Sequence, residues 1–255
     1  MEDAMTNRSN RVRLAIAACI VLWAGWSDTL SAQDENRIER FSGHAPGEAL
    51  PAGWGRQSLP KVERDNRFEL VEDGGVTVLQ VRSERSASTL FHRLDADPAR
   101  TPLLRWRWKV SNVVAGSDLT RREGDDYAAK VYVLFDYPSE RLSLGTRLQM
   151  TLARTLYGAQ LPAAAITYVW GTAQPAGASA PNAYTDRVRM QVVESGAEQV
   201  GQWVEVERNL ALDFERLFGE TAPKVVGIAV SADTDNTGEA VTAWFGDLRL
   251  SGVER

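Results

Sequence analysis

The amino-acid sequence predicts one all-β domain, an antiparallel β-sandwich of the jelly-roll kind with one amphipathic helix and one short helix inserted. Short segments rich in β-branched and aromatic residues recur between turns of Gly, Pro, Asn and Asp, which is the pattern of an antiparallel sandwich. These segments greatly outnumber the helical ones. They do not alternate with helices, as the strands of a parallel α/β sheet would.

Composition excludes several classes of protein. The 255 residues are 44% hydrophobic and 25% charged, which is typical of a globular chain and not of a disordered, collagen-like or multi-span membrane protein. A formal net charge of −5 gives no basic footprint for nucleic acid. His44, His92 and Cys19 are the only histidines and cysteine, so a zinc site, a Cys–His dyad or a disulfide framework has almost no residues to form it.

The strands are predicted in chain order from these patterns. Arg67–Glu72 and Val76–Arg82 form a hairpin through Asp73-Gly74-Gly75, because glycine supplies the positive φ of a tight turn. In Leu104–Val110 the residues alternate, which places four apolar side chains on one face and three basic ones on the other. Further strands are predicted at Ser88–Leu94, Ala128–Phe135, Ile166–Trp170, Val225–Ser231 and Ala240–Leu250.

A second hairpin is predicted near residue 196. Arg187–Val193 and Gln202–Leu210 flank the turn Ser195-Gly196-Ala197-Glu198. A three-residue loop would place Arg189 opposite Glu205 and Arg187 opposite Glu207.

Two helices interrupt the strands. Arg141–Tyr157 carries a leucine at every fourth position and is followed by Gly158, which favours an amphipathic helix. Leu210–Phe218 is predicted as a short helix that ends at Gly219.

The first 32 residues have the pattern of a secretory signal peptide. Basic residues precede Leu14–Trp26, an uncharged apolar run of 13 residues, and the small residues Ser31-Ala32 follow. The run is short for a membrane span of about 20 residues. We therefore predict a signal peptide at residues 1–32, a single domain at residues 33–255, no transmembrane segment after cleavage, and a periplasmic location.

The sequence allows two alternatives to cleavage near Ala32. One is an uncleaved signal anchor. The other is lipidation of Cys19, since Ile16-Ala17-Ala18-Cys19 has the form of a lipobox. The lipobox is the weaker reading, because the apolar run continues beyond Cys19 to Trp26.

Several motifs distributed along the chain together resemble one family. They are Leu50–Trp54, Leu104–Val110, Gly124–Val133, Tyr168–Trp170, Asp233–Gly238 and Trp244–Leu248. Their combination resembles the bacterial domain-of-unknown-function family numbered 3047. The resemblance covers nearly all of the mature chain and implies an exported protein of about this size, but it supplies no established activity and no catalytic residues. A looser likeness, through Ala243–Leu250, is to the last strand of galactose-binding-like jelly rolls.

Basic residues on strand faces are the first candidates for ligand binding. Arg105 and Arg107 share a face with Lys109, and Arg187 shares a face with Arg189. On neighbouring strands their guanidiniums could hold carboxylates or sulfates. The simpler interpretation, which we favour, is a solvated face with cross-strand ion pairs.

The tryptophans are the second candidates. Trp54 and Trp170 lie beside loops rich in Gly and Pro, where an exposed indole could stack on a sugar ring, and Tyr168 joins them as a ligand-binding candidate. Trp106 and Trp108 share the apolar face of their strand, so core packing is their simpler role. Burial is the alternative for Trp54 and Trp170 as well, since large aromatics are usually buried in part.

Acidic loops are the third candidates. Asp125 and Asp126 are weak catalytic candidates, because adjacent carboxylates on an extended chain point to opposite faces. Either one would need Asp233 or Asp235 as a partner to form the carboxylate pair of a glycosidase.

The same loop predicts a metal site. Asp233, Asp235 and Thr237 stand at positions 1, 3 and 5 before Gly238 at position 6, as in the first half of a calcium loop. Position 12 is Trp244, which is not a ligand. Calcium is therefore the one cofactor considered, and a polar turn is the alternative.

The sequence favours a non-catalytic exported protein that binds a carbohydrate or a cell-envelope component. The alternatives are a carboxylate-dependent glycan hydrolase or lyase, and a structural or scaffolding envelope protein. Nucleic acid is not an expected partner. The sequence leaves the ligand and the oligomeric state open.

Overall fold

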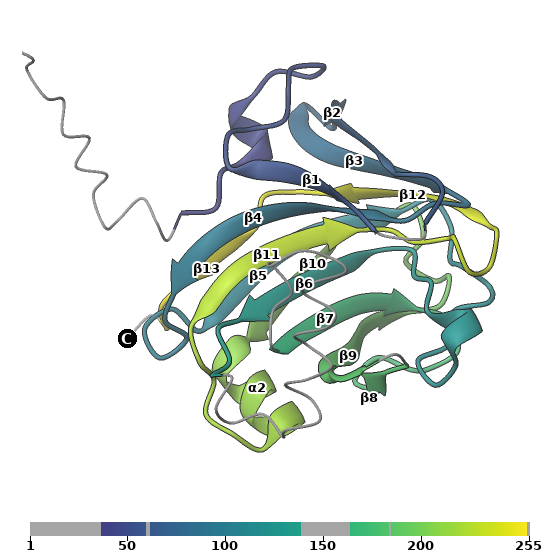
Figure 1. The fold of residues 1–255 in the computed structure, drawn as a ribbon. Coiled ribbons are helices and arrows are strands. Elements are labelled where there is room, and N and C mark those ends of the chain that lie inside the picture. Colours follow the sequence, from purple (N-terminus) through teal and green to yellow (C-terminus); the bar gives the residue numbers. More distant parts are fainter. Residues whose placement is uncertain (1–36, 60–61, 139–163, 184, 254–255) are drawn as a thin grey trace, which may run out of the picture. The chain divides into compact units, whose positions relative to one another are not determined.

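The computed structural model describes residues 37–59, 62–138, 164–183 and 185–253. Within these residues, two short 3-10 helices, one α-helix and thirteen strands follow one another (Figure 1). Their bounds are η1 Phe41–Gly43, β1 Trp54–Ser58, β2 Arg67–Asp73, β3 Val76–Glu84, β4 Ser88–Ala96, β5 Leu103–Val110, η2 Arg122–Gly124, β6 Lys130–Phe135, β7 Ala164–Gly171, β8 Ser179–Asn182, β9 Thr185–Ser195, β10 Val204–Asn209, α2 Leu210–Phe218, β11 Val225–Ser231, β12 Ala240–Phe245 and β13 Arg249–Ser251.

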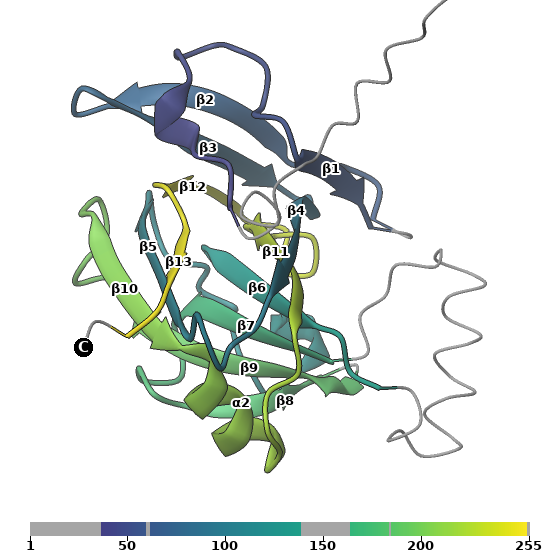
Figure 2. The same cartoon turned by 90° about the vertical axis from the view of Figure 1, so that its left-hand side faces the viewer.

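Two sheets face each other and confirm the predicted β-sandwich (Figure 2). The seven-stranded sheet has the order β1-β4-β11-β6-β7-β9-β8. The six-stranded sheet has the order β10-β5-β12-β3-β2, and β13 also pairs with β5. Neighbouring strands are antiparallel apart from β7 and β9, which run parallel.

Alternation of side chains explains why the core lies between these sheets. On β5 the apolar residues Leu104, Trp106, Trp108 and Val110 are buried, whereas Arg105, Arg107 and Lys109 lie on the outer face. Side chains from β7, among them Tyr168 and Trp170, meet this apolar face from the opposite sheet. The predicted hairpin of Arg67–Glu72 and Val76–Arg82 is confirmed as β2 and β3.

The predicted hairpin around Gly196 is wrong. β9 pairs with β7 and β8 in the seven-stranded sheet, whereas β10 pairs with β5 in the other sheet. The chain between them therefore crosses from one layer to the other. The partner of Glu205 across the ladder is Arg107, not Arg189, and the partner of Glu207 is Arg105, not Arg187.

The short helix α2 is confirmed at Leu210–Phe218. The Asn209 side chain caps its first turn by accepting a hydrogen bond from Leu212 N at 3.1 Å, and Gly219 ends it with φ 73°. The predicted helix Arg141–Tyr157 and the predicted signal peptide at residues 1–32 lie outside the described residues.

The predicted last strand Ala240–Leu250 is interrupted. β12 ends at Phe245, β13 begins at Arg249, and Gly246, Asp247 and Leu248 lie between them. Gly246 N still donates a hydrogen bond to Arg107 O at 2.9 Å, so the chain stays beside β5. Asp247 therefore lies in the gap between β12 and β13.

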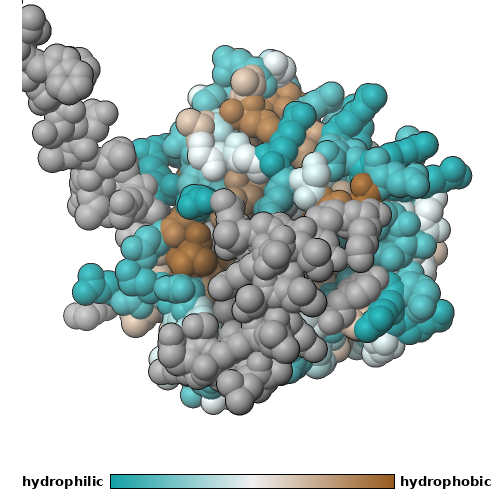
Figure 3. All heavy atoms as spheres, viewed as in Figure 1, coloured by the Kyte–Doolittle hydropathy of each residue, from teal (hydrophilic) through white to brown (hydrophobic). Residues whose placement is uncertain are grey.

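In the described part of the chain no helix is long and apolar enough to cross a membrane. In the same view as Figure 1, hydrophilic residues cover most of the coloured surface, and hydrophobic residues form small separate patches (Figure 3).

Candidate ligand-binding face

Two half-buried tryptophans and two basic residues gather on the outer face of the six-stranded sheet. Lys109 and Trp244 are paired across β5 and β12, and Trp203 directly precedes β10 on the other side of β5. The Lys109 ammonium lies 5.1 Å from the Trp203 ring and 4.7 Å from the Trp244 ring. The Arg107 guanidinium lies 4.5 Å from the Trp203 ring. We call Arg107, Lys109, Trp203 and Trp244 the Trp–Arg face.

Asp73, at the end of β2, holds this face together. Its carboxylate pairs with Lys109 and accepts a hydrogen bond from Trp203 Nε1 at 3.2 Å. The hydrogen bond from Lys109 is the main reason why the pKa of Asp73 is lowered, and burial opposes it. The carboxylate therefore remains ionised at neutral pH and keeps the Trp203 indole in one orientation.

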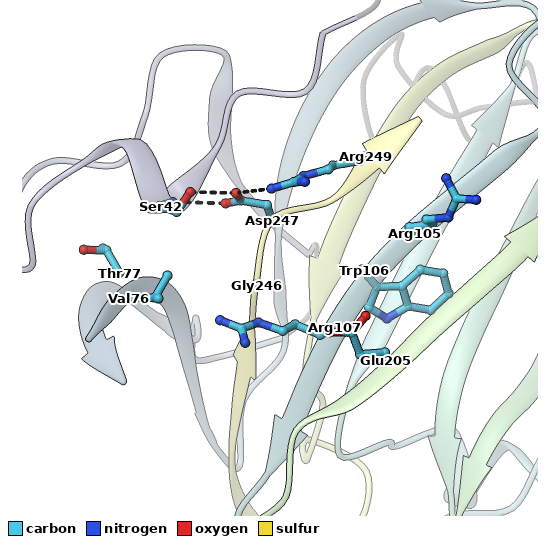
Figure 4. Close-up of a pocket in the computed structure, with 10 residues that line it drawn as sticks. All are labelled: Ser42, Val76, Thr77, Arg105, Trp106, Arg107, Glu205, Gly246, Asp247 and Arg249. Carbon is cyan, nitrogen blue, oxygen red and sulfur yellow. Dashed lines mark hydrogen bonds and ion pairs between the residues drawn. The ribbon is translucent and has the colours of Figure 1, made fainter. Parts of the chain in front are cut away.

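A pocket of about 350 Å³ opens beside the Trp–Arg face (Figure 4). Its size falls at the small end of ligand-binding pockets, which range over about 300–1,000 Å³. Parts of the chain that are remote in sequence line it: η1, the start of β3, β5, β10 and the segment that joins β12 to β13. The lining residues are Ser42, Val76, Thr77, Arg105, Trp106, Arg107, Glu205, Gly246, Asp247 and Arg249.

Gly246 leaves the space in which the Arg107 side chain lies. A Cβ atom at Gly246 would be 2.6 Å from Arg107 Cγ and 2.8 Å from Nε, closer than van der Waals contact allows. Figure 4 shows Arg107 reaching from β5 past Gly246 toward Val76 and Thr77 at the end of the β2–β3 hairpin. Because Gly246 has no side chain, the Arg107 guanidinium can extend into the pocket.

Three other charged groups of the pocket, Asp247, Arg249 and Arg105, already have partners. Asp247 accepts hydrogen bonds from the Ser42 backbone N at 3.0 Å and the Ser42 hydroxyl at 2.6 Å, and Arg249 lies 3.5 Å from it. Arg105 pairs with Glu207 at 2.5 Å and donates to the Ser251 hydroxyl at 2.8 Å. These contacts fix the rim of the pocket.

The aromatic residues proposed as a sugar platform lie in the interior. Trp170 and Tyr168 are buried in the core, and Trp170 packs 5.9 Å from Trp108 while its Nε1 donates to Gly196 O at 3.1 Å. Trp54 is buried against Phe41, with its Nε1 donating to Glu39 O at 2.8 Å. None of the three has an open ring face, so this placement does not fit a platform. The core role predicted for Trp106 and Trp108 is confirmed.

The predicted basic residues are divided between the two sheets. Arg105 and Arg107 line the pocket. Arg187, on β9, instead stacks over the rings of Tyr137 at 4.2 Å and Phe218 at 5.7 Å. The condition for one shared basic patch, that these strands be neighbours, is therefore not met.

The acidic candidates surround a buried lysine at one end of β6. Lys130 Nζ pairs with Asp233 and lies 3.9 Å from Asp125 Oδ1. Burial alone would lower the pKa of Lys130, but Asp233, Tyr132 and Asp125 outweigh it and raise that pKa. Burial raises the pKa of Asp233 to about 6, although Lys130 acts in the opposite direction.

The second pair of carboxylates is formed by Asp126 and Asp235. Asp126 is buried and accepts hydrogen bonds from Thr237 N at 2.7 Å and Asn236 Nδ2 at 3.1 Å. Burial, and then the carboxylate of Asp126, raises the pKa of Asp235. The structure thus places these two loops in contact. None of the four carboxylates lines the pocket described above.

The predicted calcium ligands do not converge. Asp233 faces Lys130 and accepts from the Ser231 hydroxyl at 2.7 Å, whereas the Thr237 backbone turns to Asp126. Among the described residues, no group of three or more His, Cys, Asp or Glu side chains could hold a metal ion. The ammonium of Lys130 supplies the positive charge that the loop faces.

Sequence reasoning did not assign several residues of this site to ligand binding, among them Trp203, Trp244 and Asp247. The alternation in Ala240–Phe245 contained the signal for Trp244. Val241, Ala243 and Phe245 are buried, so Trp244 lies on the opposite, outward face. No such signal marked Asp247, because its position depends on the interruption of the strand.

Comparisons with known proteins give one family and several distant folds. The model of the family described as "Protein of unknown function (DUF3047)" matches residues 52–249. No curated protein matches significantly. Among solved structures, a family 29 carbohydrate-binding module complexed with cellulohexaose is 10% identical at a TM-score of 0.32, covering 80% of this chain and 84% of that one.

Two further solved structures are similarly distant. A carbohydrate-binding module specific for non-crystalline cellulose is 12% identical, with a TM-score of 0.37 and coverage of 81% of this chain and 97% of that one. The xyloglucanase domain of a type three effector from Sinorhizobium fredii is 8% identical, with a TM-score of 0.39 and coverage of 79% and 96%. The family match, in contrast, spans most of the sequence, and the chain belongs to the DUF3047 family.

Proposed function

We propose that this protein is an exported, non-catalytic glycan-binding protein and that its ligand lies on the Trp–Arg face and in the adjacent pocket. The observation that carries the proposal is the pair of half-buried indoles, Trp203 and Trp244, set among basic side chains beside a polar pocket. Both indoles are partly exposed, and they lie on the face of the sheet that contributes Arg107 to the pocket.

The chemistry of a sugar suits this arrangement. A sugar ring presents C–H groups on its faces, which pack on an indole, and hydroxyls at its edge, which need hydrogen-bond partners. Ser42, Thr77, Glu205 and the arginines supply such partners within the pocket. Because Asp73 and the two cations hold Trp203, little conformational entropy is lost when a ligand packs on it.

Export is the second part of the proposal and is supported by the sequence alone. The basic residues, the apolar run Leu14–Trp26 and Ser31-Ala32 have the order of a cleavable secretory signal. A periplasmic location would bring the Trp–Arg face to the glycans of the cell envelope.

Binding should be measured first on a glycan array and then by titration with a glycan that the array identifies. We expect Trp203→Ala and Trp244→Ala each to weaken binding tenfold or more, about 1.4 kcal/mol, and Trp203→Phe to retain part of it because an aromatic ring remains. Thermal unfolding of each variant checks that the sandwich is intact. Wild-type protein that binds no glycan, or alanine variants that bind with unchanged affinity, would overturn the proposal.

One observation favours an enzyme instead. Two carboxylates, Glu205 and Asp247, line the same pocket, and a pair of carboxylates is what glycoside hydrolysis requires. Incubation with the bound glycan, followed by measurement of new reducing ends and of unsaturated products, separates the two functions. Turnover that Glu205→Gln or Asp247→Asn abolishes would establish the hydrolase or lyase.

A further inference from the structure

The Arg107 guanidinium is held over an aromatic ring, and no described residue accepts a hydrogen bond from it. The Arg107 side chain is half-buried and lies over the Trp203 ring at 4.5 Å. Within the residues that the structure describes, it makes no side-chain hydrogen bond and no ion pair, although Glu205 stands opposite it across the ladder. Five N–H donors are therefore directed into or beside the pocket without a protein acceptor.

Most of the charges around Arg107 are paired with one another. Arg105 pairs with Glu207, Arg249 lies against Asp247, and Lys109 pairs with Asp73. Arg107 stands opposite Glu205 across the ladder without an ion pair between them. A bound carboxylate would give the Arg107 guanidinium the two-oxygen acceptor that no described residue supplies.

We infer that the pocket takes the carboxylate of an acidic sugar residue, with Arg107 as the side chain that holds it. This inference rests on the proposed glycan binding and names the class of glycan. A guanidinium presents two parallel N–H groups that match the two oxygens of a planar carboxylate, and its stacking on Trp203 fixes the plane of that fork. The sugar ring that bears the carboxylate would then lie against the Trp–Arg face.

The absence of a side chain at Gly246 supports a dedicated place for Arg107. The φ of Gly246 is not in the left-handed region, so the backbone itself does not require glycine there. Glycine is instead favoured by the Arg107 side chain, because a Cβ at Gly246 would lie 2.6 Å from Arg107 Cγ. The strand edge is thus shaped to let the guanidinium pass into the pocket.

The test compares two ligands that differ only in the carboxylate. Short oligogalacturonates are titrated against the exported protein, and the same oligomers as methyl esters serve as the neutral control. We expect the acid to bind at least tenfold more tightly than the ester at low salt. The difference should shrink as the salt concentration rises, because the pocket is open to solvent.

Variants assign the difference to Arg107. Arg107→Gln should abolish the preference for the acid. Arg107→Lys should keep only part of it, since an ammonium has the charge without the fork. Gly246→Ala should lower affinity for the acid by displacing Arg107. Arg93→Gln is the matched control, because Arg93 is an exposed residue of β4 in the other sheet.

The outcomes separate this inference from the proposed function. Equal binding of acid and ester, both lost in Trp203→Ala, would overturn the carboxylate assignment and leave glycan binding intact. A sulfated neutral oligomer that binds as tightly as the acid would also overturn it. No binding of any glycan would overturn both. If the Arg107→Gln variant still preferred the acid, Arg107 would not be the residue that holds the carboxylate.

Discussion

The tryptophans of this chain divide into two groups according to what surrounds each ring. Trp108 and Trp170 lie in the core 5.9 Å apart, and neither ring reaches solvent. Trp203 and Trp244 lie across the sheet from them, with cations on their rings. Residue type alone therefore does not distinguish a core indole from one on the outer face, whereas the side of the strand on which it lies does.

Replacing Trp170 tests the first group. We expect Trp170→Ala to lower the free energy of unfolding by about 3–5 kcal/mol, because the substitution removes a buried aromatic and leaves a cavity in the core. Trp170→Phe should cost clearly less, since most of the ring remains. Chemical denaturation measures both values. A near-native stability for Trp170→Ala, with glycan binding lost, would return Trp170 to the role of a sugar platform.

At the level of elements, local patterns predicted most strands but not how all of them pair. Alternation in Leu104–Val110 and the glycines at 74 and 75 correctly predicted β5 and the β2–β3 hairpin. The same kind of signal at Gly196 failed. Gly196 does adopt a positive φ of 78°, but the chain continues through residue 203 into the opposite sheet. A turn residue determines a local bend, and the next pairing depends on long-range packing.

The candidate site was predicted only in part for the same reason. Arg105 and Arg107 were identified from their outward positions on β5, and the structure places both in the pocket. Trp54 and Trp170 were chosen because they adjoin loops, which is a weaker guide to exposure than strand alternation. Asp247 depends on Ser42, a residue 205 positions away, and no local pattern relates the two.

The pair of Lys130 and Asp233 joins the start of β6 to the end of β11 and gives a prediction at this scale. Lys130→Met should lower the free energy of unfolding by about 3–5 kcal/mol, because it leaves a buried carboxylate without its counter-charge. The double variant Lys130→Met/Asp233→Leu should be less destabilised than Lys130→Met. Denaturation curves of the two singles and the double give the coupling. Additive effects would contradict a direct interaction.

The destabilisation caused by Lys130→Met should depend on pH in a definite direction. The pKa of Asp233 is raised by burial to about 6 even beside Lys130, above the 3.8 of an unfolded chain. Protonation therefore favours the folded state, and the contribution of this group is lost as the pH rises through about 6. Removal of Lys130 raises that pKa further, so Lys130→Met should be less destabilised, relative to wild type, at pH 5 than at pH 7.

For the whole molecule, the pocket is assembled from nearly the full length of the domain. Ser42 comes from η1, Thr77 from the first hairpin, Arg107 from the middle of the sheet and Asp247 from the last strands (Figure 4). The hydrogen bonds between Ser42 and Asp247 tie the N-terminal segment to the C-terminal one. The pocket therefore requires the complete sandwich.

At the scale of the whole chain, we predict that the domain is exported. When the full sequence is expressed in a Gram-negative host, we expect the protein in the periplasmic fraction, with an N-terminus near Gln33. Replacing the basic residues of the first segment with Glu (Arg8, Arg11 and Arg13) should retain the precursor in the cytoplasm, because a signal peptide needs a positive n-region before its apolar run.

Intact mass measures the cleavage, and thiol titration measures Cys19, which cleavage would remove. Wild-type protein recovered from membranes with Cys19 still present would contradict cleavage, and a lipid adduct on that cysteine would favour the lipobox instead.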